Sequence, residues 1–271
     1  MRILLSLLFA SLLMLSFVPQ GITAQGRDGS PDIKRIMSKG KITVALVNRD
    51  RYPFYMTTKG GQLTGFDIDL ARDIASRLGV RVEFNRNAKT FDEVIDIVAK
   101  KEADLGISNL TVTLKRAKQV HFTRPYLAVK NYLLVNRKGL GSHRGLSVGE
   151  MANRRGIKIL AEEGSSYAEF SSRIFPLAKI VSHKDRERAI QAVLKNEAFA
   201  LYESEDFIKT LFKNTPELYL YLDYLVIDGV KDTIAIAVHW ENLHLLSWLD
   251  LYLKTVWSDA TIDDILKKYP K

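Results

Sequence analysis

The apolar residues of this chain recur with two periods, one typical of strands and one typical of helices. Residues 41–48 (KITVALVN) form a mainly apolar run that predicts a buried strand. From Phe66 to Leu78 a large apolar residue recurs every fourth position, which predicts one face of a helix, and Gly79 is placed to end it. Residues 80–84 (VRVEF) then alternate as a half-buried strand does.

The same order of strand and helix continues along the rest of the chain. Further strands are predicted at 104–107, 157–161, 179–181 and 199–202, and further helices at 91–101, 167–175, 189–195, 206–212, 242–257 and 260–269. Two such β-loop-α-β-α-β units in series predict an α/β fold with two lobes, each built on a largely parallel sheet. We expect lobe 1 to comprise residues 31–130 and 232–271, and lobe 2 to comprise residues 131–231.

The amino-terminal segment has the features of an export signal. Met1 and Arg2 precede an apolar run at residues 3–18, and Ala24 offers a small residue for cleavage, so residues 1–24 are predicted to be a signal peptide. The apolar run is shorter than the roughly 20 residues that span a bilayer as a helix, although an uncleaved anchor is the alternative. The sequence contains no cysteine, which excludes disulfides and a lipid-modified cysteine. We therefore expect a mature protein that is free in a bacterial periplasm.

Composition and charge narrow the function further. Hydrophobic residues make up 46% of the chain and charged residues 26%, which is typical of a globular protein. The formal charge is +9, and removal of the leader takes away one arginine, so the mature charge is 39 − 31 = +8. The basic residues are evenly spread and no nucleic-acid-binding motif is present, so we expect no nucleic-acid partner.

The spacing of the five histidines indicates no metal site, and no phosphate loop or nucleophile elbow occurs. We expect no metal, no cofactor and no catalytic residue.

Four polar loops follow predicted strands. In open α/β sheets ligands bind at the carboxyl ends of strands. The loops at those ends are 48–55, 108–113, 162–166 and 203–206. If the two lobes face each other, these loops line one cleft.

The segment SNLTVTLKR (residues 108–116) places a cation where a helix is expected to begin. Thr113 is a candidate N-cap, and the first turn after such a cap favours an acidic residue, yet Lys115 and Arg116 stand there. The planar guanidinium of Arg116 fits a carboxylate with two parallel hydrogen bonds, and Thr111 is near enough to complete such a site. The alternative is a surface arginine that follows a cap.

The second half offers a matching pair of sites. Gly164, Ser165 and Ser166 precede a predicted helix, whose free N–H groups attract anions, although the serines also suit ordinary N-capping. Glu203 ends an apolar strand, where its carboxylate either holds an ammonium or is solvated. Two anion sites and one carboxylate together suit a zwitterion.

Several segments resemble one protein family over nearly the whole mature chain. They are GQLTGFDIDLARDIASRLG (61–79), ADLGISNLTVTLKRAKQVHFTRPY (103–126), EEGSSYAEF (162–170) and ALYESED (200–206). The chain resembles the bacterial extracellular solute-binding proteins of the polar amino-acid type (family 3) and the related ligand-binding cores of ionotropic glutamate receptors. The resemblance implies the type II periplasmic-binding-protein fold, in which two α/β lobes are joined by a hinge.

The resemblance also implies roles for individual residues. Arg116 would hold the α-carboxylate of the ligand with support from Thr111, and the backbone carbonyl of Asn109 would accept a hydrogen bond from the ligand ammonium. Ser165 and Ser166 would donate to the carboxylate. In the same way, Glu203 would hold the ammonium, and Tyr52 would stack on the ligand.

Three departures from the family pattern concern the site. Glu203 stands where bacterial members usually have aspartate, and His121 stands where an acidic residue is usual. The loop NRDRYPFY (48–55) is one residue short, which leaves the register of Tyr52 open. Arg49 and Arg51 in this loop favour an acidic ligand, whereas Asp50 favours a basic or amide ligand.

We therefore expect a monomeric binding protein that captures an amino acid and delivers it to the membrane permease of an ABC importer. The alternatives are a periplasmic enzyme, since cyclohexadienyl dehydratases resemble the same family, and the sensor module of a signalling system.

Overall fold

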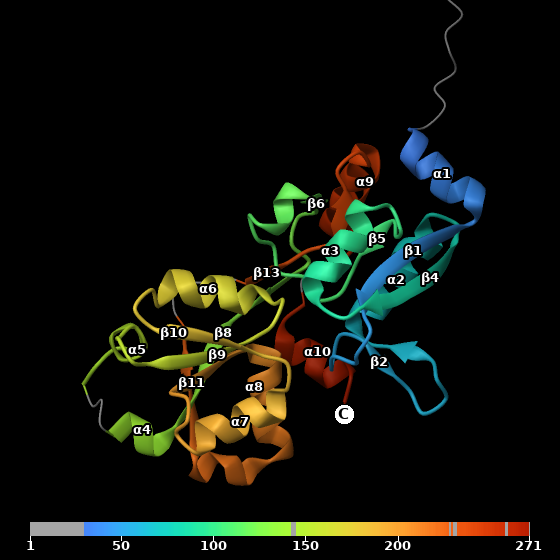
Figure 1. The fold of residues 1–271 in the computed structure, drawn as a ribbon. Helices are drawn as coiled ribbons and strands as arrows, with labels where there is room; N and C mark the ends of the chain where they lie inside the picture. The colour runs from blue at the N-terminus through green and yellow to red at the C-terminus, as the bar shows by residue number, and fades with distance from the viewer. Residues whose placement is uncertain (1–29, 142–144, 228, 230–231, 258–259, 271) are drawn as a thin grey trace, which may run out of the picture.

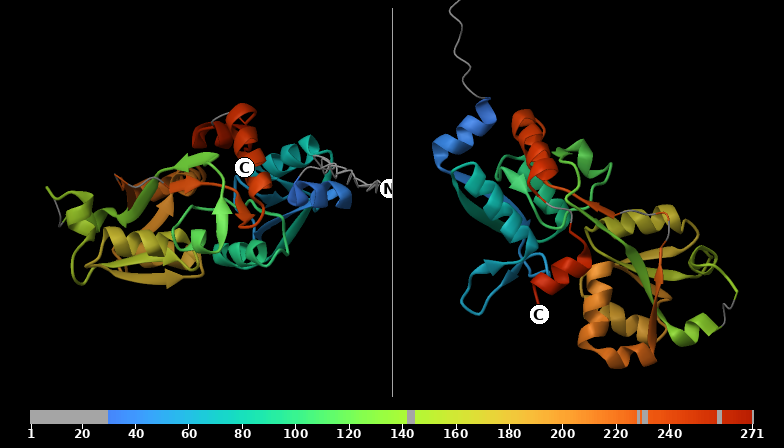
Figure 2. Two further views of the ribbon diagram at one scale, coloured as in Figure 1. Left: turned by 90° about the horizontal axis from the view of Figure 1, so that it is seen from above. Right: turned by 180° about the vertical axis from the view of Figure 1, so that it is seen from behind.

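The computed structural model describes residues 30–141, 145–227, 229, 232–257 and 260–270. The predicted signal peptide, residues 1–24, lies outside the described residues. The chain folds into two α/β lobes that lie side by side (Figure 1, Figure 2). Within the described parts of the chain, no helix has both the length and the apolar character needed to cross a membrane.

Lobe 1 contains a five-stranded sheet with the order β4-β1-β5-β14-β6. Its strands are β1 (Lys41–Val47), β4 (Arg81–Ala88), β5 (Leu105–Gly106), β6 (Val120–Phe122) and β14 (Ala237–His239). Its helices are α1 (Pro31–Lys39), α2 (Phe66–Arg77), α3 (Phe91–Ala99), α9 (Leu243–Thr255) and α10 (Ile262–Lys268), with a short hairpin of β2 (Met56–Thr57) and β3 (Leu63–Thr64) and a 3₁₀ turn, η1 (Arg116–Lys118).

Lobe 2 contains a second five-stranded sheet with the order β10-β9-β11-β8-β12. Its strands are β8 (Asn131–Asn136), β9 (Lys158–Glu162), β10 (Lys179–His183), β11 (Ala200–Ser204) and β12 (Leu222–Val226). Its helices are α4 (Arg137–Gly141), α5 (Val148–Ala152), α6 (Ser166–Ile174), α7 (Arg186–Leu194) and α8 (Glu205–Asn214), with a 3₁₀ turn, η2 (Pro216–Leu220).

Two strands connect the lobes. β7 (Leu127–Val129) runs from lobe 1 to lobe 2, β13 (Asp232–Ile234) returns, and the two pair antiparallel. This pair is the hinge, because its backbone hydrogen bonds hold the crossing segments together while each sheet stays separate. The predicted lobe boundaries, 130/131 and 231/232, fall at its ends and remain a prediction.

The prediction of largely parallel sheets is wrong for one half of each sheet. In lobe 1, β4, β1 and β5 are parallel, but β14 is antiparallel to both β5 and β6. In lobe 2, β10, β9 and β11 are parallel, but β8 is antiparallel to both β11 and β12. The cause is the double crossing of the hinge: β8 and β14 each follow a connecting strand and therefore run against the strands built within the lobe.

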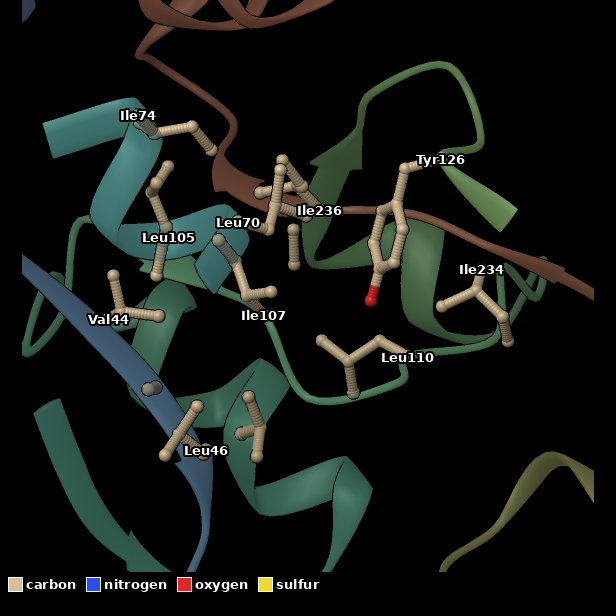
Figure 3. Close-up of a cluster of buried hydrophobic side chains, with 14 of the residues drawn as sticks. Val44, Leu46, Leu70, Ile74, Leu105, Ile107, Leu110, Tyr126, Ile234 and Ile236 are labelled. Carbon is tan, nitrogen blue, oxygen red and sulfur yellow. The ribbon is translucent and has the colours of Figure 1, made fainter. Parts of the chain in front are cut away.

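The predicted apolar helix face is part of the core of lobe 1. Leu70 and Ile74 of α2 are fully buried and face Val44 and Leu105 of the sheet (Figure 3). Tyr126, directly before β7, and Ile234 of β13 complete the same cluster. Leu110, from the loop after β5, belongs to the same cluster, so the core also holds that loop in place.

The carboxyl-terminal helix α10 belongs to lobe 1 but reaches lobe 2, where it packs against α8. Lys209 Nζ of α8 lies 2.8 Å from Asp263 Oδ1 of α10. This exposed ion pair spans the two lobes beside the hinge.

Candidate functional site

The four loops that follow strands meet between the lobes. The loop after β1 contributes Arg49 and Arg51, which contact Glu162 at the end of β9. The loop after β5 contributes Thr111 and Arg116, which contact the turn that begins α6. Loops from both lobes therefore form one site at the carboxyl ends of the strands.

Arg116 is a buried residue of this site and not a surface arginine. Its Nε lies 3.0 Å from Asp92 Oδ1, its Nη1 donates to the Thr111 carbonyl at 3.0 Å, and its Nη2 donates to the Gly164 carbonyl at 3.1 Å. Its side chain is 4% exposed. The last of these bonds crosses from lobe 1 to lobe 2, so the guanidinium binds the two lobes together.

The expected helix at Arg116 is only a 3₁₀ turn of three residues. Thr113 does accept a hydrogen bond from the backbone N–H of Arg116, at 3.2 Å. A turn this short has too few aligned peptides for a sizeable macrodipole. The expectation of a helix at this position is therefore wrong, and the fork of Arg116 is the feature that can bind a carboxylate.

Asp92 is a partner of Arg116 that the sequence reasoning missed. It lies in the first turn of α3, whose N-cap is Thr90. Burial acts to raise the pKa of Asp92, but Lys115 and Arg116 hold it below its ordinary value. The carboxylate is thus ionised at neutral pH, and its hydrogen bond with Nε fixes the orientation of the guanidinium.

The two candidate serines at the start of α6, Ser165 and Ser166, make different contacts. Ser165 is the N-cap of α6: its hydroxyl donates to the Glu162 carbonyl at 2.6 Å and accepts from the Tyr167 N–H at 3.3 Å. Ser166 instead donates across the cleft to the Thr111 hydroxyl at 3.0 Å. Thr111 and Ser166 are both buried. The fold therefore brings these two predicted site residues together in the interface between the lobes.

Asn109 has a left-handed backbone, with φ 49°, at the point where the chain turns beneath the site. Its N–H donates to Asp67 Oδ2 at 2.6 Å, and Tyr126 donates to the other carboxylate oxygen at 2.9 Å. Burial nevertheless raises the pKa of Asp67 to about 7. These bonds fix the turn from which the carbonyl of Asn109 was predicted to reach the ligand.

Tyr52 is positioned by its own lobe. Its hydroxyl donates to the backbone carbonyl of Tyr269 at 2.6 Å. The residue also lines a cavity of about 360 Å³ between the loop after β1 and the helices α7 and α8. A stacking role for Tyr52 against a ligand therefore stays a prediction.

Glu203 is fully buried at the end of β11 and is not solvated. Its Oε1 accepts from Arg186 Nε at 2.7 Å, and Arg186 also approaches Glu162 Oε2 at 3.4 Å. Burial raises the pKa of Glu203, and the charge of Arg186 counteracts only part of this effect. The predicted ammonium partner therefore already has one cationic partner within lobe 2.

Two further carboxylates, Asp206 and Asp232, lie close enough to the buried Tyr167 hydroxyl to add to the rise that burial causes in its pKa, as Glu203 does. Burial raises the pKa of Asp232, in the hinge strand β13, to about 6, and a hydrogen bond with Thr111 and the charge of Arg116 limit the increase. Asp206, at the start of α8, is also buried and lines the cavity. Among the described residues, three buried carboxylate oxygens have no hydrogen-bond donor: Glu203 Oε2, Asp206 Oδ1 and Asp232 Oδ1.

Sequence reasoning did not assign five charged residues of this site. They are Asp92, Glu162, Arg186, Asp206 and Asp232. It considered Arg51 only as a loop cation that favours an acidic ligand. The available signal was the position of Glu162 directly after the apolar run 157–161, since buried strand ends seldom carry unpaired acids. In the described residues, no group of three or more potential ligands has the arrangement of a metal site.

The fold and this interlobe site define a class of two-lobed binding proteins. The chain belongs to the bacterial extracellular solute-binding proteins, family 3, whose sequence profile matches residues 42–271. The ABC transporter arginine-binding protein 1 of Escherichia coli (strain K12) is 24% identical over 214 residues, which cover 79% of this chain and 84% of that protein. These relationships confirm the resemblance read from the sequence.

Solved structures agree on the fold, which is the type II periplasmic-binding-protein fold. The amino acid ABC transporter substrate-binding protein AbpA of Streptococcus pneumoniae, bound to L-arginine, has a TM-score of 0.70 and 27% identity, covering 87% of this chain and 97% of that one. The ancestral amino acid-binding protein AncCDT-1, a precursor of cyclohexadienyl dehydratase, has a TM-score of 0.69 and 28% identity, covering 88% and 99%.

Proposed function

We propose that this protein captures an amino acid between its two lobes and delivers it to the membrane permease of an ABC importer. One observation carries the proposal. Arg116 and Thr111 of lobe 1 meet Gly164 and Ser166 of lobe 2 through two hydrogen bonds in a buried interface. Donors of both lobes therefore converge where a ligand carboxylate would be bound.

The arrangement suits a carboxylate on the Arg116 side. The bond from Arg116 Nη2 to the Gly164 carbonyl exists only while the lobes are together. When the lobes separate, this donor is released and can bind a carboxylate together with the Thr111 hydroxyl. Ser166 adds its hydroxyl to the carboxylate when the lobes close again. An arginine fork gives such a contact a fixed geometry that a lysine ammonium lacks.

The arrangement suits an ammonium beside the buried carboxylates of lobe 2 and of the hinge strand β13. Glu203 Oε2, Asp206 Oδ1 and Asp232 Oδ1 are buried carboxylate oxygens without a donor among the described residues. A buried acceptor left unpaired costs about 1–3 kcal/mol, and more when it is charged. A ligand ammonium would offset that cost, so the site favours α-amino acids over acids that lack the amino group.

Lobe closure connects binding with delivery. Contacts that exist only in the closed form shift the population towards it when the ligand adds to them. A permease that recognises the closed shape would then receive only loaded protein. We infer a monomer that acts in the periplasm after cleavage of the predicted signal peptide.

A periplasmic enzyme is the second candidate, favoured by one specific observation. Asp232 is a buried carboxyl with a pKa of about 6 beside Arg116, and a carboxyl that titrates near neutral pH can transfer a proton to a bound acid. The similarity to the cyclohexadienyl dehydratase of Pseudomonas aeruginosa, which is 24% identical over 166 residues, is consistent with such chemistry on this fold.

A thermal-shift screen of the mature protein tests both candidates. The twenty amino acids and prephenate are added singly, because a ligand that binds only the native state raises the melting temperature by mass action. We expect a shift with one or a few amino acids and no consumption of prephenate. Turnover of prephenate, or the absence of any shift with every amino acid, would overturn the binding function.

A further inference from the structure

Arg51 crosses from lobe 1 into lobe 2. It belongs to the loop after β1, yet its Nη2 lies 3.5 Å from both the Tyr167 hydroxyl and the Ser204 hydroxyl. Its Nη1 lies 3.7 Å from Glu162 Oε2, and its side chain is 7% exposed. The guanidinium is therefore buried among groups of the opposite lobe.

The surroundings of Arg51 are those expected of a site for a cationic side chain. The guanidinium lies 5.4 Å from the centre of the Phe91 ring, a distance at which a ring face attracts a cation. Glu162 supplies the opposite charge. Burial acts to lower the pKa of Arg51, but Tyr167, Asp206 and Glu162 raise it above the ordinary value. An aromatic face, carboxylates and hydroxyls thus surround a cation that the chain itself supplies.

The glutamates of lobe 2 that face this region already have arginine partners, and Glu203 Oε2, the carboxylate oxygen left without a donor, is one of the three assigned above to the ligand ammonium. Glu162 contacts Arg49, Arg51 and Arg186. Glu203 contacts Arg186. A ligand with a cationic side chain would therefore meet several guanidinium groups in a region of low dielectric, where repulsion between like charges is strong. It would have to displace Arg51 to reach the same carboxylates.

We propose that Arg51 is a specificity-determining residue: its guanidinium occupies the position for a cationic ligand side chain, so the protein rejects basic amino acids. The ligand is then an amino acid whose side chain carries no positive charge, and that side chain extends into the cavity lined by Arg51 and Arg186. This inference rests on the proposed function. It distinguishes the chain from AbpA, which was crystallised with L-arginine.

Methylguanidinium tests whether the guanidinium of Arg51 fills a cation site, independently of which amino acid the protein binds. Arg51→Ala opens the position, and 10 mM methylguanidinium chloride should raise the melting temperature of this variant by about 2–4 °C. Wild type should show no such rise. Sodium chloride at the same concentration controls for ionic strength, and Arg49→Ala controls for the loss of a more exposed arginine on the same Glu162.

The double variant Arg51→Ala/Glu162→Gln should lose the response, because the opposite charge is gone. An equal response of wild type and Arg51→Ala, or no response of Arg51→Ala, would overturn the assignment. If Arg51→Ala does not fold, the calorimetry below decides whether Arg51 occupies the cation position. It uses Arg51→Met, which retains an apolar stem over Phe91.

Calorimetry with four ligands tests the specificity. Wild type should bind L-glutamine or L-glutamate at least tenfold more tightly than L-arginine and L-lysine, and Arg51→Met should lose most of this preference. Wild type that binds L-arginine as tightly as L-glutamine overturns the inference and leaves the proposed function intact. Wild type that binds no amino acid overturns the proposed function, and the methylguanidinium response alone then decides whether Arg51 fills a cation site.

Discussion

Ser166 of lobe 2 donates a hydrogen bond of 3.0 Å to the hydroxyl of Thr111 in lobe 1. The two residues are 55 positions apart and both are buried. Neither hydroxyl could be buried in this way if the lobes were apart, so the bond belongs to the closed arrangement. It joins the two segments in which the sequence predicted the carboxylate site.

Arg116→Lys should bind the ligand much more weakly than wild type although the charge is retained. One ammonium cannot replace the contacts that Arg116 makes with Asp92, Thr111 and Gly164. Loss of a charged contact in a closed site costs about 2–5 kcal/mol, which titration calorimetry measures directly. The control is Lys115→Ala, which removes an exposed cation from the same Asp92. Equal affinity of Arg116→Lys and wild type would exclude Arg116 as the carboxylate anchor.

Gly164→Ala should prevent full closure. A Cβ at this position would lie 2.8 Å from Thr90 Cβ of the opposite lobe, and φ is +69°. Ligand affinity should fall at least tenfold, and small-angle scattering with ligand should report a larger radius of gyration than for wild type. Gly156→Ala is the matched control, because its φ of +85° imposes similar backbone strain with nothing within 4 Å. A loss of affinity shared by both variants would trace the effect to backbone strain and not to closure.

Glu203→Gln should leave a folded protein that no longer prefers α-amino acids to their 2-oxo and 2-hydroxy analogues. Glutamine retains the size and one acceptor, but the charge opposite the ligand ammonium is lost. Arg186 keeps Glu162 as a partner at 3.4 Å, so the ion cluster survives. Competition titrations give the preference, and circular dichroism checks the fold. A variant that still prefers amino acids would exclude Glu203 as the ammonium partner.

Asp67→Asn should flatten the pH dependence of stability. In the folded protein burial raises the pKa of Asp67 to about 7, against an ordinary value of 3.8. The folded state therefore retains a proton that the unfolded chain releases, and stability falls as the pH rises from about 4 to about 7. Between pH 5 and pH 7.5 this one group lowers the free energy of unfolding by on the order of 3 kcal/mol.

Urea unfolding of wild type and Asp67→Asn at these two pH values measures the difference. Asp73→Asn, on the same helix, is the control: its pKa is lowered, so its contribution is lost only below the ordinary pKa and does not alter the comparison. An unchanged slope in Asp67→Asn would show that this carboxyl is ionised in the folded protein.

The sequence by itself determined most of the secondary structure and the loops that form the candidate site. The apolar face from Phe66 to Ile74 lies in the core, as its fourfold spacing predicted, because burial of one stripe is what makes such a helix stable. The loops at the carboxyl ends of strands do meet between the lobes. Arg116 was notable because it stands where an acid is usual, and the structure buries it.

Tertiary structure alone decided the strand directions and the charge pairing. Local periodicity does not record that the chain crosses the hinge twice, so the antiparallel β8 and β14 could not be derived from it. The ion pairs of Glu162 with Arg51 and of Glu203 with Arg186 join segments far apart in the sequence. Whether a charged residue lies in solvent or against an opposite charge depends on which loops the fold brings together. That is why Arg51, one of several loop arginines in the sequence, became a buried cation only once the two lobes were placed against each other.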